Sequence, residues 1–329
     1  MTLKYIKLIK GLDLKDFKIL YELDKNSRAS LTEIAKKTRL SKEVVFHRIN
    51  KLIEKGYILR FQAVISTYRI GYQSYKIYLK LQNLTKVAKQ EIQEYLLKNK
   101  NIFWIGNCQG KWDLIIAAWA KNVREFSKIQ DEILGKLSNY VLEKEISISS
   151  KSIQFNRRWF YAGAETIETT FGEELEPVKV DDIDLKILEE LALNSRIKIV
   201  DLAEKLGITV AVVIYRIKQL EKNKVITGYK IALDPKKMNY ETCKAFIYLK
   251  EIKEERKNEL LNYIKSMKNA LNIVLTAGRW EMEIEFEVKN FKEYYVLMAE
   301  LQEKFSDIIK TYDSVVLVSE PKQFFMPKA

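Results

Sequence analysis

Two short stretches of this chain combine charged, polar and aromatic side chains in patterns suited to binding a partner or a ligand, and the first is residues 42–55. Its apolar residues follow a helical spacing that predicts one buried stripe made of Val44, Ile49, Leu52 and Ile53. The side chains predicted to face outward are Lys42, Glu43, Phe46, His47, Asn50 and Lys51. Early outward groups on such a helix can reach base edges in a DNA groove, while Lys42, Arg48 and Lys51 can hold phosphates. The alternative is a solvated amphipathic helix, with Arg48 in a salt bridge within its own domain.

The second stretch is the Gly-Lys-Trp-Asp tetrapeptide at residues 110–113. Glycine tolerates a positive φ between two strands, so the plain interpretation is a hairpin turn. The carboxylate of Asp113 can also accept hydrogen bonds from an ammonium or amide group, which would suit a small ligand. Both interpretations stay open at this point.

Both stretches recur later in the chain at one constant offset. Residues 26–28 and 194–196 both read Asn-Ser-Arg, and residues 110–113 align with 278–281, in each case 168 positions apart. A period this long exceeds the 20 to 50 residues or so of solenoid repeats and indicates a duplicated pair of domains. The expected join is residues 161–177, which lack periodicity.

Each copy has the same predicted order of elements. Three short helices come first, with Ser30 and Ser41 as caps of the second and third and a tight turn at residues 38–41. Strands at 58–66 and 74–81, a helix at 86–98, strands at 101–108 and 112–120, a helix at 123–137 and a strand at 140–149 follow. The last six of these elements form a βαββαβ pattern, which is ferredoxin-like. We therefore expect an α+β protein made of two tandem copies of a helix-turn-helix domain followed by a ferredoxin-like domain.

Composition limits the classes of partner and site. The net charge of +13 fits a polyanion partner, although lysine also serves solubility. Two cysteines, Cys108 and Cys243, and one histidine, His47, suit neither a zinc site nor a disulfide framework, so no metal or cofactor and a reducing cytoplasm are expected. No apolar run reaches about 18 residues, so no membrane span is predicted.

Residues 12–23, 30–58 and 110–119 together resemble the Lrp/AsnC (feast/famine) family of transcription regulators. The first copy matches the family's helix-turn-helix run through Leu40, Ser41, Val44 and Arg48, and the second through Ile208, Thr209, Val212 and Arg216. The resemblance implies a winged helix-turn-helix at 12–66, an effector domain at 67–160, a linker at 161–177, a second winged helix-turn-helix at 178–234 and a second effector domain at 235–329. It also implies a non-enzymatic, double-stranded-DNA-binding regulator.

The resemblance further implies a small effector, often an amino acid, at the Gly-x-x-Asp turn. The residues that it marks are Asn107, Cys108, Gln109, Gly110, Asp113, Gly278 and Glu281. Glu281 replaces the aspartate in the second copy, and this longer carboxylate would reshape or close a second pocket. On the DNA side the resemblance adds Ser41 and Arg48 to the outward set of the first copy.

The two copies differ in charge at their first domains. Residues 13–60 hold 12 basic and 7 acidic residues, whereas residues 181–228 hold 8 of each. Lys42, Glu43 and His47 correspond to Val210, Ala211 and Tyr215. Because phosphate neutralisation dominates affinity for DNA, we expect the second copy to have lost or changed its DNA-binding role.

The effector domains are expected to pair within one chain as an internal pseudo-dimer, with further self-association between chains. Alternation at residues 280–288 puts Trp280, Met282, Ile284, Phe286 and Val288 on one face and Glu281, Glu283, Glu285 and Glu287 on the other. Pairing of unlike copies would bring these acids near Lys76 and Lys80 of the first copy. The alternative is an acidic ladder balanced by Lys244 and Lys250 of the same sheet.

Two other functions stay open. Siroheme decarboxylases have a similar build and use histidine and arginine in the effector-domain cavity, but this chain has no histidine outside residues 42–55. The other possibility is an adaptor that no longer binds DNA and pairs with other regulators.

Overall fold

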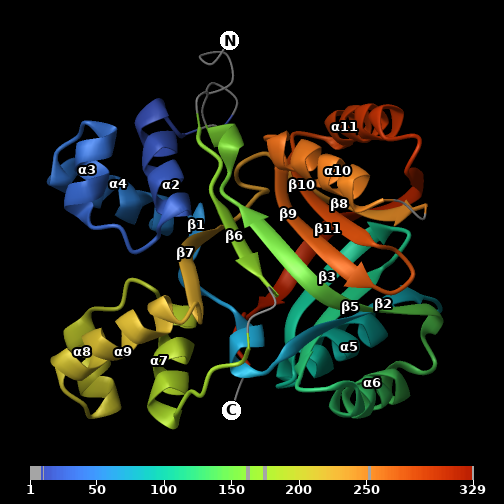
Figure 1. The fold of residues 1–329 in the computed structure, drawn as a ribbon, viewed down its shortest axis with the longest axis horizontal. Helices are drawn as coiled ribbons and strands as arrows, with labels where there is room; N and C mark the ends of the chain where they lie inside the picture. Colours follow the sequence, from blue (N-terminus) through green and yellow to red (C-terminus); the bar gives the residue numbers. More distant parts are fainter. Residues whose placement is uncertain (1–8, 10, 161–163, 173–175, 251–252, 328–329) are drawn as a thin grey trace.

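A computed structural model describes residue 9 and residues 11–160, 164–172, 176–250 and 253–327. The first copy contains α2 (Leu14–Lys25), α3 (Leu31–Thr38), α4 (Lys42–Glu54), β1 (Ile58–Ile65), η1 (Thr67–Ile70), β2 (Gln73–Leu81), α5 (Lys86–Lys98), β3 (Ile102–Gly110), β4 (Leu114–Ala120), α6 (Val123–Leu137) and β5 (Val141–Phe155). Next come η2 (Arg158–Phe160) and β6 (Glu168–Phe171). The second copy contains α7 (Asp182–Leu193), α8 (Ile199–Leu206), α9 (Val210–Lys222), β7 (Ile226–Leu233), β8 (Glu241–Leu249), α10 (Glu254–Ser266), β9 (Ala270–Ala277), β10 (Met282–Val288), α11 (Phe291–Lys304) and β11 (Ile309–Gln323). The expected order of helix-turn-helix and ferredoxin-like domains is confirmed in both copies (Figure 1).

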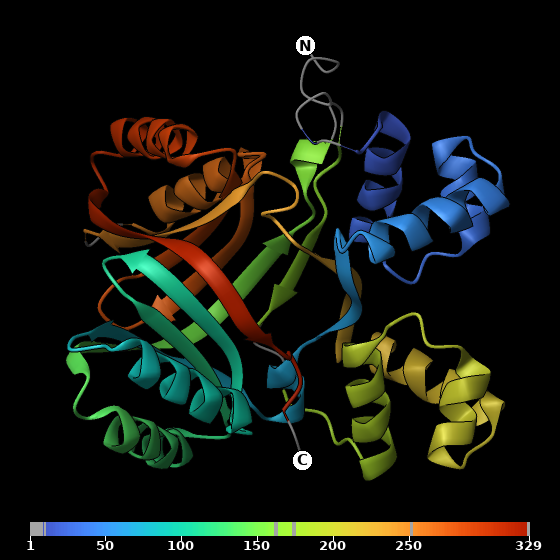
Figure 2. The ribbon, with the colours of Figure 1, turned by 180° about the vertical axis from the view of Figure 1, so that it is seen from behind.

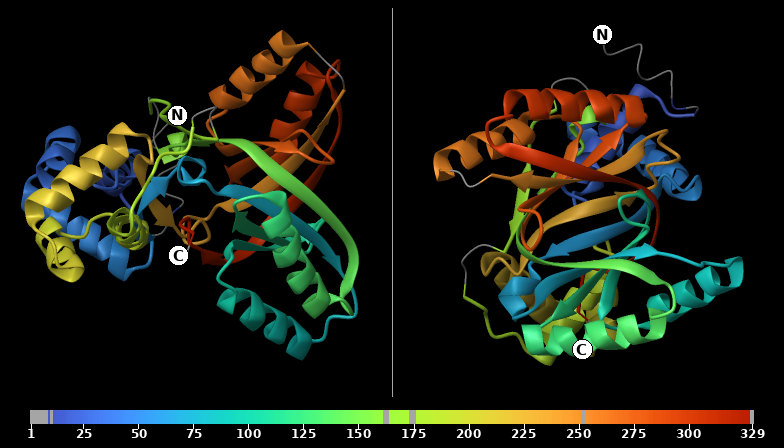
Figure 3. Two further views of the ribbon diagram at one scale, coloured as in Figure 1. Left: turned by 60° about the horizontal axis from the view of Figure 1, so that its bottom comes forward. Right: turned by 90° about the vertical axis from the view of Figure 1, so that its right-hand side faces the viewer.

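The two ferredoxin-like sheets join into one barrel. The strand order is β2-β4-β3-β11-β8-β10-β9-β5-β6, and an additional pairing of β2 with β5 closes the ring. The copies meet at two antiparallel seams, β3 with β11 and β5 with β9. Helices α5 and α6 cover one side of the barrel, and α10 and α11 cover the opposite side (Figure 3). The expected internal pseudo-dimer is therefore built into the fold, and closure leaves few free strand edges.

The two helix-turn-helix domains lie side by side, away from the barrel helices (Figure 2). Strand β1 of the first copy pairs antiparallel with β7 of the second, from Ile58 opposite Leu233 to Ile65 opposite Ile226. Each wing strand thus finds its partner in the other copy. This shared two-stranded sheet connects both helix-turn-helix domains to the barrel.

The expected linker at 161–177 needs a correction. Residues 168–171 form strand β6, which pairs with residues 152–155 of β5. Residues 161–163 and 173–175 of that segment lie outside the described residues. The strand escaped prediction because its pairing partner is the far end of β5, which runs beyond the predicted residue 149 to Phe155.

Alternation on β10 was predicted correctly with one exception. Met282, Ile284, Phe286 and Val288 pack in the core under α10 and α11. Trp280, however, lies in the cluster between the two sheets, with Tyr78, Trp112 and Phe246. It precedes the strand, in the turn, and so does not follow the strand's alternation.

Candidate DNA-binding face and effector turn

The helix-turn-helix of the first copy is set by local caps. Helix α3 ends at Thr38, Arg39 takes a left-handed conformation with φ of 56°, and the hydroxyl of Ser41 accepts a hydrogen bond from the Val44 amide to begin α4. The Ser30 hydroxyl caps α3 in the same way and forms a capping box with Glu33. Both predicted caps are confirmed.

The buried stripe of α4 differs from the predicted one. Val45, Ile49 and Leu52 are buried, whereas Val44 and Ile53 are 39% and 42% exposed. The buried set follows the spacing of four and three residues that one helix face requires. Val44 and Val45 are both apolar, so the local pattern did not decide which of them points inward.

The predicted outward residues lie as expected on the exposed surface of α4. Lys42, Glu43, Phe46, His47 and Lys51 are exposed, and Asn50 is half-buried. Phe46 is 48% exposed, and its ring contacts that of His47 at 5.7 Å between centroids. Hydrogen bonds from its own amide and from Ser41 lower the pKa of Glu43, so this side chain is an ionised acceptor.

Arg48 has a different position from the other candidates. Its Nη1 donates to both carboxylate oxygens of Asp13, at 3.0 and 2.9 Å, and to Oδ1 of Asp16 at 2.7 Å. Arg216 of the second copy bonds Asp181 and Asp184 in the same way. The guanidinium therefore ties α4 to α2, which is the intradomain salt bridge considered as the alternative to a phosphate contact.

The corresponding surface of α9 is apolar. Val210, Ile214 and Tyr215 are 39%, 40% and 63% exposed, and Ala211 is also exposed. Lys218 and Lys222, the exposed cations of α9, lie further along the helix. The buried stripe of Val213, Ile217 and Leu220 repeats that of α4, so the two helices have the same fold and different outer faces.

The two helix-turn-helix domains are held together by a reciprocal contact. The hydroxyls of Ser27 and Ser195 lie 2.7 Å apart. Arg28 donates to the Ser195 carbonyl at 2.8 Å, and Arg196 donates to the Ser27 carbonyl at 2.7 Å. These are the Asn-Ser-Arg segments whose repetition defines the offset of 168, so they face each other across a pseudo-twofold axis. The contact fixes the spacing between α4 and α9 within one chain.

The predicted effector turn lies at a seam of the barrel. Gly110 has a φ of 130°, and a Cβ there would lie 2.4 Å from the Ser314 carbonyl oxygen of the other copy. The carboxylate of Asp113 accepts a hydrogen bond from the Leu81 amide at 2.8 Å and from Lys80 at 3.0 Å. Lys80, expected near the acidic strand of the second copy, therefore bonds within its own copy instead.

The other turn residues fall into two groups. Gly278 and Glu281 form the matching turn at the opposite seam, where Gly278 lies against Ile146 and Glu281 accepts from the Leu249 amide at 2.7 Å. Asn107 donates to the Ser319 hydroxyl at 2.9 Å across the first seam. Cys108 is buried, which raises the pKa of its thiol to about 12, and Gln109 is exposed. The two turns are thus separate, and each touches the last strand of the other copy.

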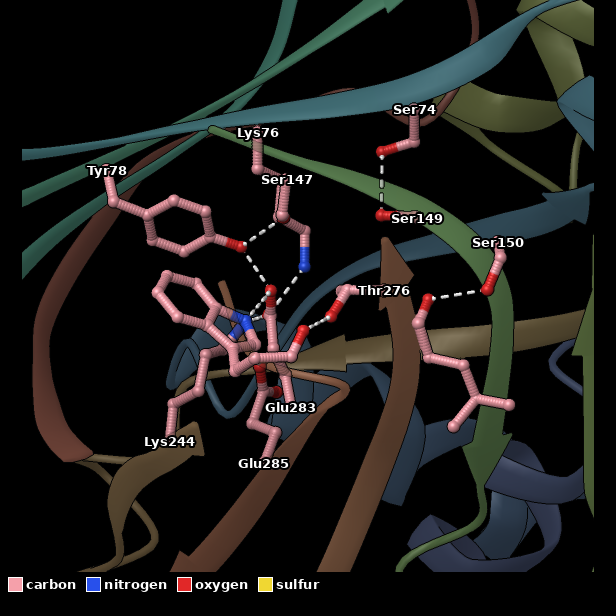
Figure 4. Close-up of polar contacts among 12 residues, drawn as sticks. Ser74, Lys76, Tyr78, Ser147, Ser149, Ser150, Lys244, Thr276, Glu283 and Glu285 are labelled. Atoms are coloured by element: carbon pink, nitrogen blue, oxygen red, sulfur yellow. Dashed lines mark hydrogen bonds and ion pairs between the residues drawn. The ribbon is translucent and has the colours of Figure 1, made fainter. Parts of the chain in front are cut away.

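A buried charge cluster lies between the sheets (Figure 4). Lys76 Nζ bonds Glu283 Oε2 at 2.6 Å, and Lys244 Nζ lies 3.4 Å from the same oxygen and 3.5 Å from Glu285 Oε2. The Tyr78 hydroxyl also donates to Glu283. Burial alone would raise the pKa of Glu283, but the two lysine charges and the hydrogen bonds from Lys76 and Tyr78 hold it at about 2. The expected contact between unlike copies is confirmed for Lys76 and Glu283. Lys244 of the same sheet also offsets the charge of Glu283, as the alternative prediction proposed.

Comparison with known proteins agrees with these domains. A family model described as a winged helix-turn-helix DNA-binding domain matches residues 12–58 and again residues 180–227. The HTH-type transcriptional regulator FL11 of Pyrococcus abyssi is 31% identical over 123 residues, which are 37% of this chain and 80% of that relative. The regulator Ptr1 of Methanocaldococcus jannaschii is 32% identical over 103 residues, or 31% of this chain and 68% of that protein.

Solved structures of one enzyme are similar over nearly the whole chain. The crystal structure of the siroheme decarboxylase NirDL has a TM-score of 0.65 and 11% identity, covering 95% of this chain and 94% of that one. At this identity the similarity shows the shared fold alone. The described part of this chain contains no helix long and apolar enough to cross a membrane. The sequence relatives, the two helix-turn-helix matches and the duplicated architecture establish that this chain belongs to the Lrp/AsnC-like helix-turn-helix transcriptional regulators, in a tandemly duplicated form.

Proposed function

We propose that this DNA-binding regulator reads a specific sequence mainly through α4 of its first copy. The observation that supports this most is the contrast between the two outer faces: α4 exposes Lys42, Glu43, His47 and Lys51, whereas α9 exposes mostly apolar side chains. Cations that reach phosphates supply most of the affinity for DNA. Helix α9 has Val210 and Gln219 at the positions of Lys42 and Lys51, so it would hold the fold and the spacing but bind weakly.

The side chains of α4 divide into two roles. Lys42 and Lys51 lie at its ends and would hold phosphates, together with Ser41 at the cap and Asn50 on the flank. Glu43, Phe46 and His47 would meet base edges, where an ionised carboxylate can accept from cytosine and an aromatic ring can contact a thymine methyl. Arg48 would act by positioning α4 on α2, since Asp13 and Asp16 already bind its guanidinium.

Binding to duplex DNA at two salt concentrations tests this proposal against the adaptor alternative. If α4 neutralises two or three phosphates, affinity for a random duplex is expected to fall at least about tenfold between 50 and 200 mM salt. Fluorescence anisotropy with a labelled duplex measures this. An absence of binding at the lower salt concentration would favour the adaptor.

An effector site at the first-copy turn is part of the proposal, and Asp113→Ala tests it. The supporting feature is the position of the turn, where Asp113 and Gly110 lie at the seam between the copies. Calorimetry with the standard amino acids is expected to detect one that binds, and the variant is expected to weaken it about tenfold or more, as loss of a charged hydrogen-bond partner does.

Glu281→Ala is the matched control for that test. Glu281 accepts from the Leu249 amide as Asp113 does from the Leu81 amide, so both variants lose an equivalent structural hydrogen bond. Loss of ligand affinity only in Asp113→Ala would assign the effector to the first turn. Unchanged affinity in Asp113→Ala would place the effector elsewhere.

An enzymatic role analogous to that of NirDL has no comparable support. The only histidine in the sequence, His47, lies on α4 and outside the barrel. We further propose that the regulator acts in the cytoplasm, and that two chains associate on a palindromic operator because each offers one helix, α4, with charged and polar side chains placed to read DNA.

A further inference from the structure

A cavity of about 190 Å³ lies where strand β1 crosses the barrel. Its lining comes from both copies and includes residues 62–65 of β1. A cavity of roughly 150 Å³ is enough to admit benzene. The space therefore suits a ligand with one ring or a short branched chain and a small polar group.

The walls of this cavity are largely aromatic. Phe103 stacks on Trp119 with 3.8 Å between ring centroids, and Phe325 lies 6.0 Å from Phe103. Trp104 lines another side and already carries Lys244 over its ring at 5.0 Å. Aromatic faces attract cations, most strongly where water is excluded.

Carboxylates outnumber the cations around the cavity. Glu285, Glu320, Lys76 and Lys244 line it, and Glu283 lies just beside the two lysines, so three carboxylates face two cations. Lys244 divides its charge between Glu283 and Glu285, at 3.4 and 3.5 Å, while Lys76 binds Glu283. Glu320 accepts a hydrogen bond from the Trp104 indole at 2.7 Å. Burial and the charge of Glu285 raise the pKa of Glu320 to about 7. A positive ligand would relieve the repulsion between these two carboxylates.

Two lining residues have buried polar atoms without a hydrogen-bond partner in the described part of the chain. They are the side-chain carbonyl oxygen of Asn272, an acceptor, and the indole nitrogen of Trp119, a donor that an ammonium group cannot satisfy and that is left to a water. Buried polar groups are rarely left unpaired, so such atoms point to a bound molecule or water. The Asn272 oxygen can accept a hydrogen from an ammonium group.

We propose that this cavity binds a small primary amine with an apolar body, with Glu285 and Glu320 as its counter-charges and Asn272 as a further acceptor. The site is distinct from the Gly110 turn, whose residues do not line it. The ligand would contact β1, which follows α4 and pairs with β7, so it would touch the strand that connects the DNA-binding domains to the barrel. Binding itself does not depend on the DNA-binding proposal.

Titration calorimetry on the full chain with matched probes tests the assignment. Phenethylamine and isobutylamine carry the cation, while 3-phenylpropionate and isovalerate present the same apolar bodies with a carboxylate. At least one amine is expected to bind at least about tenfold more tightly than its matched carboxylate. Failure of both amines to bind, or equal binding of the carboxylates, would overturn the proposal.

The position of the bound amine is tested by Glu320→Gln, with Glu303→Gln on α11 as the control. The first variant is expected to lower the affinity for the amine about tenfold, because a charge-assisted hydrogen bond becomes a neutral one. Glu303 is exposed and does not line the cavity, so its variant is expected to leave affinity unchanged. Equal affinity in both variants would overturn the role of Glu320.

The unmodified protein gives an independent measurement. Amine affinity is expected to rise about tenfold from pH 6 to pH 8, because the ionised fraction of Glu320 rises from about a tenth to about nine tenths for a pKa of about 7. Lys244 on β8, Glu285 on β10 and Trp104 on β3 face this carboxyl from the barrel. The other charged groups near it line an adjoining pocket that Glu320 also borders: Arg60, Asp234, Lys236 and Glu241. An affinity independent of pH across this range would contradict the assignment.

Discussion

Replacement of Glu283 by glutamine is expected to lower the free energy of unfolding by about 3 to 5 kcal/mol at pH 7. Removal of one partner from a buried ion pair leaves the other charge uncompensated, and this is the usual magnitude of that loss. Glu283 is 1% exposed and binds Lys76 at 2.6 Å. In the variant, Lys244 would still form its ion pair with Glu285, but Lys76 would lose its closest carboxylate partner. Denaturation in urea at pH 7 measures the difference, and Glu303→Gln on the exposed face of α11 should change stability by less than about 0.5 kcal/mol.

The same measurement at low pH distinguishes loss of the Glu283 charge from a disturbance of side-chain packing. A pKa of about 2 for Glu283, below the ordinary value near 4.3, means that its contribution is fully present above about pH 4.3 and is lost as pH falls toward 2. The stability difference between the natural protein and Glu283→Gln should therefore shrink between pH 7 and pH 3. A difference that stays constant with pH would mean that the variant disturbs packing instead.

This cluster also explains why the two copies diverged in their barrel strands. Lys76 and Lys244 occupy equivalent positions, and so do Ile115 and Glu283. A barrel built from two first copies would bury two lysines beside isoleucines, and one built from two second copies would bring four central glutamates together. Only the unlike pair balances two lysines, Lys76 and Lys244, with two glutamates, Glu283 and Glu285. Fusion in one chain guarantees that pair, because each copy always finds the other at high effective concentration.

Much of the fold followed from local pattern, and the failures have a common cause. Helices α5 and α6 begin and end at the predicted residues 86–98 and 123–137, since their caps and stripes lie within the segments themselves. Strand β6, by contrast, exists because distant residues pair with it. Val45 rather than Val44 points into the core because of how α4 packs against the other helices of its domain. The local sequence does not reveal that packing.

The candidate sites show the same division between local and distant causes. The exposed set on α4 was predictable because one helix carries all of it. The salt bridge of Arg48 was predicted only as an alternative and without its partners, since Asp13 and Asp16 lie 35 and 32 positions away. The cavity beside Glu320 was missed entirely, because its lining comes from strands of both copies that meet only when the barrel closes.

Removal of the two lysine charges from α4, in Lys42→Gln with Lys51→Gln, is expected to weaken DNA binding about 100-fold at low salt. It should also reduce the slope of log affinity against log salt by about two, since each phosphate contact contributes about 0.9 to that slope. The effect should be similar on all duplex sequences. Replacement of Glu43 or His47 should instead change sequence preference more than overall affinity. Anisotropy titrations at several salt concentrations measure both quantities.

The second copy supplies the matched control, because Val210 and Gln219 occupy the positions of Lys42 and Lys51. Val210→Gln and Tyr215→Ala on α9 should change affinity by less than about threefold. The contact between Ser27 and Ser195 holds α9 beside α4 whether or not α9 binds DNA, so proximity alone does not make it a reader. With one competent reader in each chain, a palindromic site must recruit two chains, and occupancy should depend on the square of protein concentration near the midpoint. A tight complex of one chain per duplex, weakened equally by changes on α4 and α9, would contradict this account and show that both copies read DNA.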